Sequence, residues 1–170
     1  MEDSLCFVEK VFTDSEGEES GELVKNLVKE IISKKYYEPN LDLIMVNEKD
    51  EIIGYTLFSR FAIDNKYDDT LLLLSPVAVK TELQRRHISK DLIEYGLAKA
   101  KELGYKAVIV EGNPRNYNPR GFKSSFNYGI YAHESVGLTD PECLMVIELE
   151  EGALNDISGY VDYRYYDALR

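Results

Sequence analysis

Apolar and polar positions follow two different periods along the chain, and the change of period divides it into elements. Between residues 23 and 32, apolar side chains recur three and four positions apart, which predicts an amphipathic helix ending before Pro39. Residues 5–12 form a shorter, mostly apolar run that we interpret as a first strand. The acidic residues 13–22 between them predict a turn.

Five further apolar runs predict strands. Residues 41–47 and 51–63 flank a polar tripeptide and favour a hairpin. Residues 69–79 are almost entirely apolar, as in a central strand, and residues 105–112 and 143–150 predict two more buried strands.

A second helix is predicted from Ile88 to Leu103, with Gly104 at its C-terminal end. Gly96 falls on its buried face, where the missing side chain lets helix and sheet come close. This order of elements predicts a mixed α/β sheet with helices on its faces. With 170 residues, the chain is expected to form one domain over residues 1–170.

Composition narrows the choice of partners and compartment. The net charge of -11 argues against general binding to nucleic acid or to an anionic membrane, because both need clustered positive charge. No run approaches the ~18 apolar residues of a membrane span. The two cysteines, Cys6 and Cys143, are far apart, which is typical of a reducing compartment, so we expect a cytoplasmic protein.

Pro76 interrupts the predicted central strand. A proline has no N–H for the strand ladder, so it predicts a bulge or a local parting of strands. The backbone of Val77, Ala78 and Val79 would then have hydrogen-bonding groups left for a ligand. The alternative is a strand that ends at Ser75.

The polar stretch from Gln84 to Ser89 lies between this strand and the helix that follows it. The first N–H groups of a helix lack partners and favour anions, and ligands of open α/β sheets bind beyond the strand ends. Residues 80–90 carry four Lys or Arg side chains against Glu82 alone, which favours an anionic ligand. The alternative is a solvated basic turn. Neither a Walker motif nor GxGxxG is present.

The stretch from SPVAVKTELQRRHISKDLIEYG through GNPRNYNPRGF resembles the coenzyme-binding core of the GNAT superfamily of N-acetyltransferases, and the tail LMVIELEEGALNDISGYVDY resembles its YhbS-like branch. The resemblance implies a GNAT-like fold, with a central, mostly antiparallel sheet, splayed strands and helices on both faces. It also implies acetyl-CoA as co-substrate. This sequence departs from the family pattern at His87 and Ser89, which replace small residues, and at Arg120, which replaces an aromatic before Gly-Phe.

By this resemblance, backbone N–H groups of the turn hold the pyrophosphate of coenzyme A, and the bulged strand pairs with the pantetheine arm. The expected cofactor-binding residues are Val77, Ala78, Val79, Gln84, Arg85, Arg86, His87, Ile88, Ser89, Lys90, Asn113 and Tyr117.

The resemblance also implies Tyr117 as the acid that protonates the leaving thiolate; alternatively, Tyr117 packs beside Phe122. Glu111 is the candidate base, or a solvated residue at a strand end. The N–H of Val79 is a candidate oxyanion donor. His87 is a ligand contact or an exposed turn residue, and a lone histidine gives no reason to expect a metal.

We therefore expect an N-acetyltransferase that uses direct attack by a primary amine of a small molecule or a protein. The alternatives are an acetyl-CoA-binding sensor or interaction domain with weak or no catalysis, and a module for another phosphorylated ligand. No nucleic-acid or membrane partner is expected, and the protein is expected to be a monomer or homodimer. Residues 33–41, 60–70 and 123–142 are expected to line the acceptor pocket.

Overall fold

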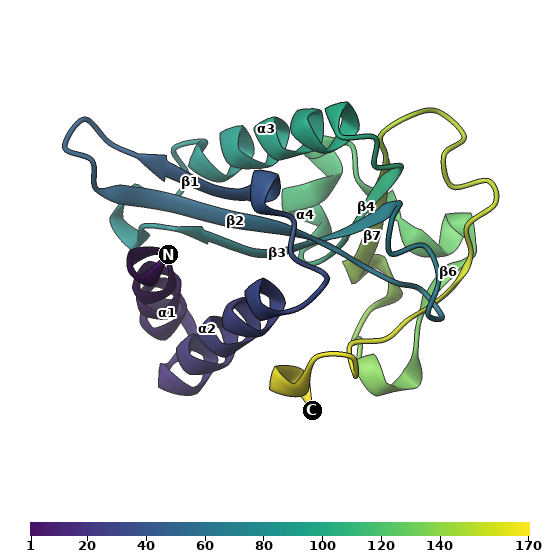
Figure 1. The fold of residues 1–170 in the computed structure, drawn as a ribbon, viewed down its shortest axis with the longest axis horizontal. Helices are drawn as coiled ribbons and strands as arrows, with labels where there is room; N and C mark the ends of the chain where they lie inside the picture. The colour runs from purple at the N-terminus through teal and green to yellow at the C-terminus, as the bar shows by residue number, and fades with distance from the viewer.

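The computed structural model describes residues 1–170 as a twisted sheet between helices (Figure 1). The helices are α1 (Glu2–Glu16), α2 (Glu18–Ser33), α3 (Ile88–Glu102) and α4 (Pro114–Tyr117). The strands are β1 (Asp42–Val46), β2 (Ile52–Arg60), β3 (Leu71–Val79), β4 (Ala107–Glu111), β5 (Lys123–Ser124), β6 (Ile130–Ala132), β7 (Leu144–Glu148) and β8 (Gly159–Val161). Short 3₁₀ helices are η1 (Pro39–Leu41), η2 (Thr81–Leu83), η3 (Asn118–Arg120), η4 (Ser125–Tyr128), η5 (Glu134–Val136), η6 (Pro141–Cys143) and η7 (Asp167–Leu169).

Six strands form the main sheet in the order β1-β2-β3-β4-β7-β5, and β6 and β8 form a separate parallel pair. Within the main sheet only β3 and β4 run parallel, and the other neighbouring strands are antiparallel. The sheet is therefore mixed and mostly antiparallel, which confirms the expected fold class. The junction of β3 with β4 is where two antiparallel halves meet.

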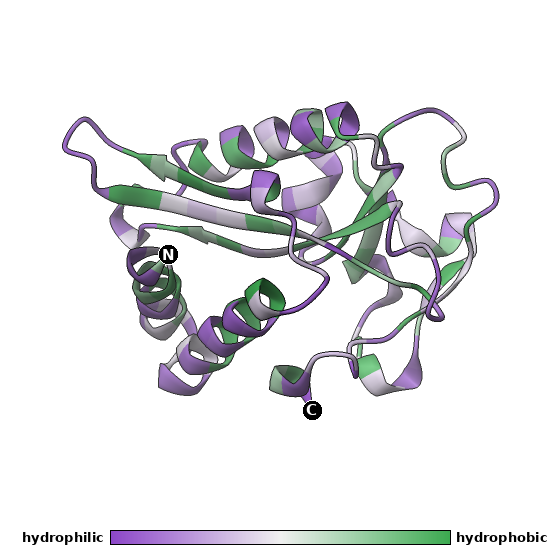
Figure 2. Ribbon diagram, in the orientation of Figure 1, coloured by the Kyte–Doolittle hydropathy of each residue, from purple (hydrophilic) through white to green (hydrophobic).

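Helices cover both faces of the sheet and create two apolar cores. Val8 of α1 and Ile31 of α2 belong to a core on one face, where Leu57 of β2 is fully buried. Ile93 of α3 packs on the opposite face with Phe58 of β2. In Figure 2 hydrophobic and hydrophilic colours alternate along α1, α2 and α3, as amphipathic helices require. No helix is both long and apolar enough to span a membrane.

The prediction of a strand over residues 5–12 is wrong, because these residues lie within α1. Val8 and Val11 are buried, and Leu5 and Phe12 pack beside them. Their spacing of three and four residues follows one face of a helix, which a short apolar run does not distinguish from a strand. The predicted acidic turn is also mostly helical: only Gly17, with a φ of 103°, separates α1 from α2.

The remaining long elements agree with the sequence. The bounds of the β1–β2 hairpin, β3, α3, β4 and β7 all lie within two residues of the predicted ones, apart from the end of β2, which comes three residues earlier than predicted. Short β5, β6 and β8 were not predicted. Gly96 lies where expected: a Cβ there would stand 2.2 Å from the Phe58 ring. Gly54 of β2 has the same role beneath Ile88, at 2.7 Å, so α3 begins close to the sheet.

Candidate functional site

A bulge in β3 marks the centre of the site. Thr56 of β2 faces Val77 and Phe58 faces Leu74, so two steps along β2 correspond to three along β3. The extra residue reverses which side chains face each core: Leu74 and Val77 both pack on the α3 side. The strand continues through Pro76, whose carbonyl accepts a hydrogen bond of 3.0 Å from the Thr56 hydroxyl. The sequence-based expectation of a bulge is confirmed, and the alternative that the strand ends at Ser75 is wrong.

Beyond the bulge, one edge of β3 has no strand partner. β4 pairs with β3 only over Leu71–Leu73, so the two strands separate before Ser75. The N–H of Lys80 donates to Ile53 of β2 at 3.0 Å, and hydrogen-bonded pairs alternate along an antiparallel ladder. This alternation directs the backbone groups of Ala78 toward β2 and those of Val77 and Val79 toward the gap. Two of the three expected backbone positions therefore face open space.

The turn before α3 presents a row of free backbone donors. The N–H groups of residues 85–90 have no acceptor within the chain, and the first helical bond is donated by Asp91 to His87 at 3.0 Å. Arg85 and His87 both have left-handed φ values, 64° and 65°, which point successive N–H groups outward. His87 is the N-cap of α3 and makes no side-chain cap. This geometry, together with the helix dipole, suits an anion.

The free edge and the free turn line one cleft of about 550 Å³, which we call the β3–α3 cleft. Eight expected site residues line it: Val77, Val79, Gln84, Arg85, His87, Ile88, Ser89 and Tyr117. The sequence-based expectations did not include seven others: Val11, Phe12, Ser15 and Glu16 of α1, Ile93 of α3, and Asn116 and Arg120. Those on α1 were missed because residues 5–12 were interpreted as a strand and residues 13–22 as a turn.

Four expected cofactor residues do not line this cleft. Ala78 is buried in the core on the α1 and α2 side. Arg86 is exposed on the turn, and Lys90 lies 3.9 Å from Glu94 on the outer face of α3. Asn113 caps α4 by accepting a hydrogen bond from the N–H of Arg115 at 3.0 Å. These side chains could therefore contact only a part of a ligand that extends outside the cleft.

Tyr117 reaches the cleft from α4. Its ring packs edge-on against Phe122, with centroids 5.6 Å apart, so it both packs there and faces the open space. A Cβ at Gly112 would stand 2.5 Å from the Tyr117 ring, so this glycine lets the ring lie against the end of β4. Burial raises the pKa of Tyr117, and the charge of Arg120 partly opposes this rise. The phenol therefore keeps its proton at neutral pH.

Arg120 is the most informative residue that was not expected in the site. One guanidinium nitrogen donates to the Ser89 hydroxyl at 3.2 Å, and another donates to the backbone carbonyl of Asn116. The third nitrogen, Nε, is buried without a partner. A buried unpaired donor on a cation is unfavourable unless a ligand completes it. The feature of the sequence that could have identified Arg120 is its position three residues after Tyr117, where an aromatic residue was expected.

Glu111 lies on the other side of the gap. Successive strand residues point to opposite faces, so Glu111 points away from the ring that covers Gly112. Glu111 lines a second cavity of about 390 Å³, which we call the α2 cavity. Tyr163 shares this cavity, and burial together with the Glu111 charge raises the pKa of Tyr163 well above its ordinary value. The expected acid and the expected base thus stand on opposite sides of the gap.

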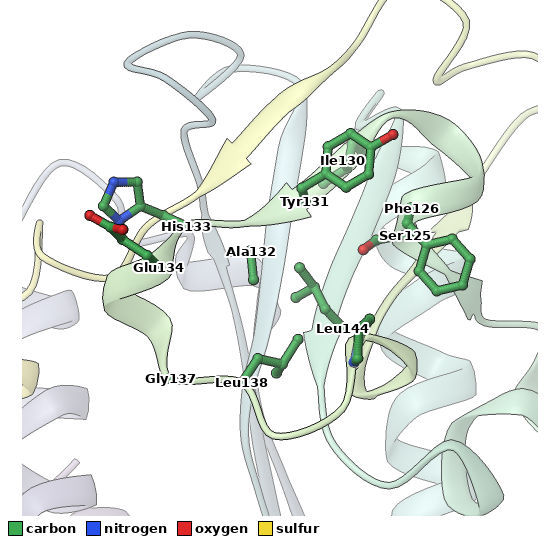
Figure 3. A pocket seen from close by; sticks show the side chains of 11 residues that line it. Ser125, Phe126, Ile130, Tyr131, Ala132, His133, Glu134, Gly137, Leu138 and Leu144 are labelled. Atoms are coloured by element: carbon green, nitrogen blue, oxygen red, sulfur yellow. The ribbon is translucent and has the colours of Figure 1, made fainter.

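A third cavity, of about 310 Å³, lies beside β6 and contains none of the expected catalytic or cofactor-binding residues, but ten of its eleven lining residues belong to the segment 123–142 that was expected to line the acceptor pocket. Figure 3 shows Leu138 and Leu144 along it, while His133 and Glu134 lie together at one end. His133 caps η5, with its ring nitrogen 3.1 Å from the N–H of Ser135. Nowhere in the chain do three or more His, Cys, Asp or Glu side chains gather as metal ligands.

Comparison with known proteins gives several solved structures of the same fold. The structure of YhbS from Escherichia coli in complex with CoA superimposes with a TM-score of 0.79 at 23% identity, over 94% of this chain and 84% of that one. A GNAT family acetyltransferase from Brucella melitensis in complex with acetyl-CoA gives 0.67 at 20% identity, over 98% and 92%. These likenesses confirm the GNAT-like fold that the sequence resemblance implied.

The amino-acid sequence also matches a known protein and a protein family. It is 28% identical over 126 residues to the uncharacterized N-acetyltransferase YhbS of Escherichia coli K12, a match that covers 72% of this chain and 71% of that protein. The sequence profile of the acetyltransferase (GNAT) family matches residues 8–128, which is well over half of the chain. The protein therefore belongs to the GNAT family of acetyltransferases.

Proposed function

We propose that this protein transfers the acetyl group of acetyl-CoA directly to a primary amine. The observation that carries the proposal is the continuity of the β3–α3 cleft. The cleft leads from the free N–H groups at the start of α3, past the free edge of β3, to Tyr117. The CoA and acetyl-CoA bound to two relatives of the same fold support this choice of cofactor.

The cleft offers each part of the cofactor a suitable partner. The N–H groups of residues 85–90 bind the pyrophosphate, helped by the dipole of α3. Arg85 and Arg120 add charge, and the Ser89 hydroxyl adds a donor, in place of the closer backbone approach that small residues would give. The backbone groups of Val77 and Val79 pair with the amides of the pantetheine arm. Ala78, Asn113 and the side chains of Arg86 and Lys90 remain outside this assignment.

The acceptor amine approaches from the α2 cavity. An amine with a pKa near ~10.4 is unprotonated in only about one molecule per thousand at neutral pH. Glu111, directly or through a water, takes the proton from the ammonium group. Of the segments expected to line the acceptor pocket, only 123–142 contributes to this cavity, through Ser135 and Val136.

The amine nitrogen then attacks the thioester carbonyl carbon and a C–N bond forms. The N–H of Val79 faces the gap and stabilises the oxyanion that develops. The tetrahedral intermediate collapses, the C–S bond breaks, and its electron pair leaves with sulfur. No covalent bond to the enzyme is needed, because the amine and the thioester meet at the gap between β3 and β4.

Tyr117 donates its proton to the thiolate and regains one from solvent. Proton transfer from a phenol of pKa ~10 to a thiolate whose acid has pKa ~8.5 is uphill by about 2 kcal/mol. Burial of Tyr117 increases this difference, and the Arg120 cation decreases it by favouring the phenolate.

Two measurements test this function. Calorimetry with CoA reports binding, and release of thiol from acetyl-CoA across a panel of primary amines reports transfer. We expect CoA to bind with micromolar affinity and at least one amine to accelerate thiol release. If CoA binds but no amine accelerates thiol release, the result would favour an acetyl-CoA-binding sensor or interaction domain. If other nucleotides bind more tightly than CoA, the protein is instead a module for another phosphorylated ligand.

We also propose that the protein acts in the cytoplasm. Both cysteines are free, and Cys6 is exposed, which suits a reducing compartment.

A further inference from the structure

The walls of the α2 cavity indicate what kind of amine it accepts. Nine of its thirteen lining residues are hydrophobic. They come from α2, β3, η5 and the C-terminal segment, and they include Leu23, Leu27, Leu73, Val136, Tyr163 and Tyr166. The volume of about 390 Å³ lies within the range of small-molecule sites. The cavity therefore suits the apolar body of a small ligand.

Charge is concentrated at one point of this cavity. Glu111 is its only carboxylate, and Arg164 is its only cation. The Arg164 guanidinium is already paired with Asp162, at 3.0 Å from Nε and 2.5 Å from Nη2. Tyr163 stands beside the Glu111 carboxylate but is itself uncharged, so Glu111 is the one charge in the lining that no opposite charge neutralises. It stands at the end of β4, beside Gly112 and the separation of the strands.

We propose that the acceptor is a small primary monoamine with an aliphatic or arylalkyl body. Its ammonium group pairs with Glu111, and its body lies against Leu23, Leu27 and Tyr166. This inference rests on the proposed function, because it assigns the acceptor side of the same reaction. A polyamine or an aminoglycoside carries several ammonium groups, and each extra one would be buried in this cavity without a carboxylate.

A homologous series of amines tests the inference. With acetyl-CoA fixed, kcat/KM should rise about fourfold for each methylene from propylamine to hexylamine, the ~0.8 kcal/mol of a buried CH₂. Phenethylamine should match the longer members. Spermidine, kanamycin and a lysine-containing peptide should be no better than propylamine. A flat series, or a preference for one of these three, would overturn the inference.

Equilibrium binding keeps the test independent of turnover. Calorimetric titration with propylamine and hexylamine, with and without CoA, should show the same dependence on chain length. If CoA fails to bind while hexylamine still binds more tightly than propylamine, the proposed function fails and the apolar amine site stands. If CoA binds normally and the chain length of the amine has no effect on binding or turnover, the amine site fails alone.

Variants at Leu23 localise the effect. Leu23 is 42% exposed on α2, so a charge there is tolerated by the fold. Leu23→Lys should weaken hexylamine binding at least tenfold without changing the affinity for CoA. Leu23→Glu should raise the ratio of kcat/KM for 1,6-diaminohexane over hexylamine. Leu103→Lys is the matched control, because Leu103 is 39% exposed and lies outside the cavity. Equal effects of the lysine at positions 23 and 103 would contradict the assignment.

Discussion

The β3–α3 cleft and the α2 cavity lie on opposite sides of the gap between β3 and β4, and they are built from different groups. Backbone groups dominate the cleft: the N–H row of residues 85–90 and the free edge at Val77 and Val79. Side chains from five separate segments make the cavity. A site made of backbone is encoded by a continuous stretch of sequence, whereas a site made of side chains exists only after distant segments pack. The first suits a ligand bound through its polar backbone-facing groups, and the second suits a ligand recognised by the shape and polarity of its body.

The largest expected effect lies at the boundary of the two regions. Tyr117→Phe should lower turnover about 100- to 10,000-fold while leaving CoA affinity unchanged, because the ring keeps its packing and only the proton donor is lost. Steady-state thiol release and calorimetry with CoA measure the two quantities. Tyr95→Phe, at an exposed tyrosine of α3, is the control and should change neither.

A second variant separates the chemistry of this phenol from its position. Gly112→Ala leaves the phenol present but places a Cβ 2.5 Å from its ring, so the ring must move. Turnover should again fall more than the affinity for CoA. Parental turnover in both variants would make Tyr117 structural and assign the acid to water or another residue.

On the cavity side, Glu111→Gln should lower kcat/KM about a hundredfold at pH 7, because the ammonium proton loses its acceptor. The free amine becomes about a hundredfold more abundant between pH 7 and pH 9, so the deficit should shrink over this interval. A purely structural role would not produce this pH dependence. Glu102→Gln, at an exposed glutamate of α3, is the control. A deficit that stays constant with pH would remove Glu111 as the base.

Within the cleft, Arg120→Ala should weaken CoA binding about 10- to 100-fold, since charge-assisted hydrogen bonds contribute ~1.5–3 kcal/mol. Added salt should narrow the difference from the parent protein. Arg120→Lys should recover part of the affinity, because it keeps the charge but not the fork of donors. Arg115→Ala is the control, since Arg115 is exposed on α4 and does not line the cleft. Unchanged CoA affinity in Arg120→Ala would mean that the guanidinium only joins Ser89 to Asn116.

These two regions also differ in how far the sequence predicted them. Pro76 predicted the bulge, and the polar turn before α3 predicted the free donors, because both features follow from local backbone chemistry. The short strands β5, β6 and β8 have two or three residues each, too few for any period to be detected. Their formation depends on neighbours far away in the chain.

Side chains in the site were harder to predict. Arg86 and Arg85 look equivalent in the sequence, yet only Arg85 lines the cleft, because alternating left-handed residues turn their side chains in different directions. Residues of α1 enter the cleft only because α1 is a helix packed beneath β3. Leu23 and Leu169 of the α2 cavity are separated by most of the chain. No local pattern relates them.

The smallest expected effect concerns His87, whose side chain lines the cleft at a φ of 65°. A left-handed conformation costs a non-glycine residue ~1 kcal/mol, and His87→Gly removes that strain but gains entropy in the unfolded chain, so stability should change by less than ~1 kcal/mol. If the imidazole only crowds the phosphates, His87→Gly should tighten CoA binding about two- to fivefold. Arg86→Ala should change affinity less than twofold, because the Arg86 side chain is exposed outside the cleft, where water and salt screen its charge. Calorimetry at two salt concentrations measures both variants. Weaker binding in His87→Gly would make the imidazole a ligand contact, and the cleft would then depend on a side chain as well as on its backbone.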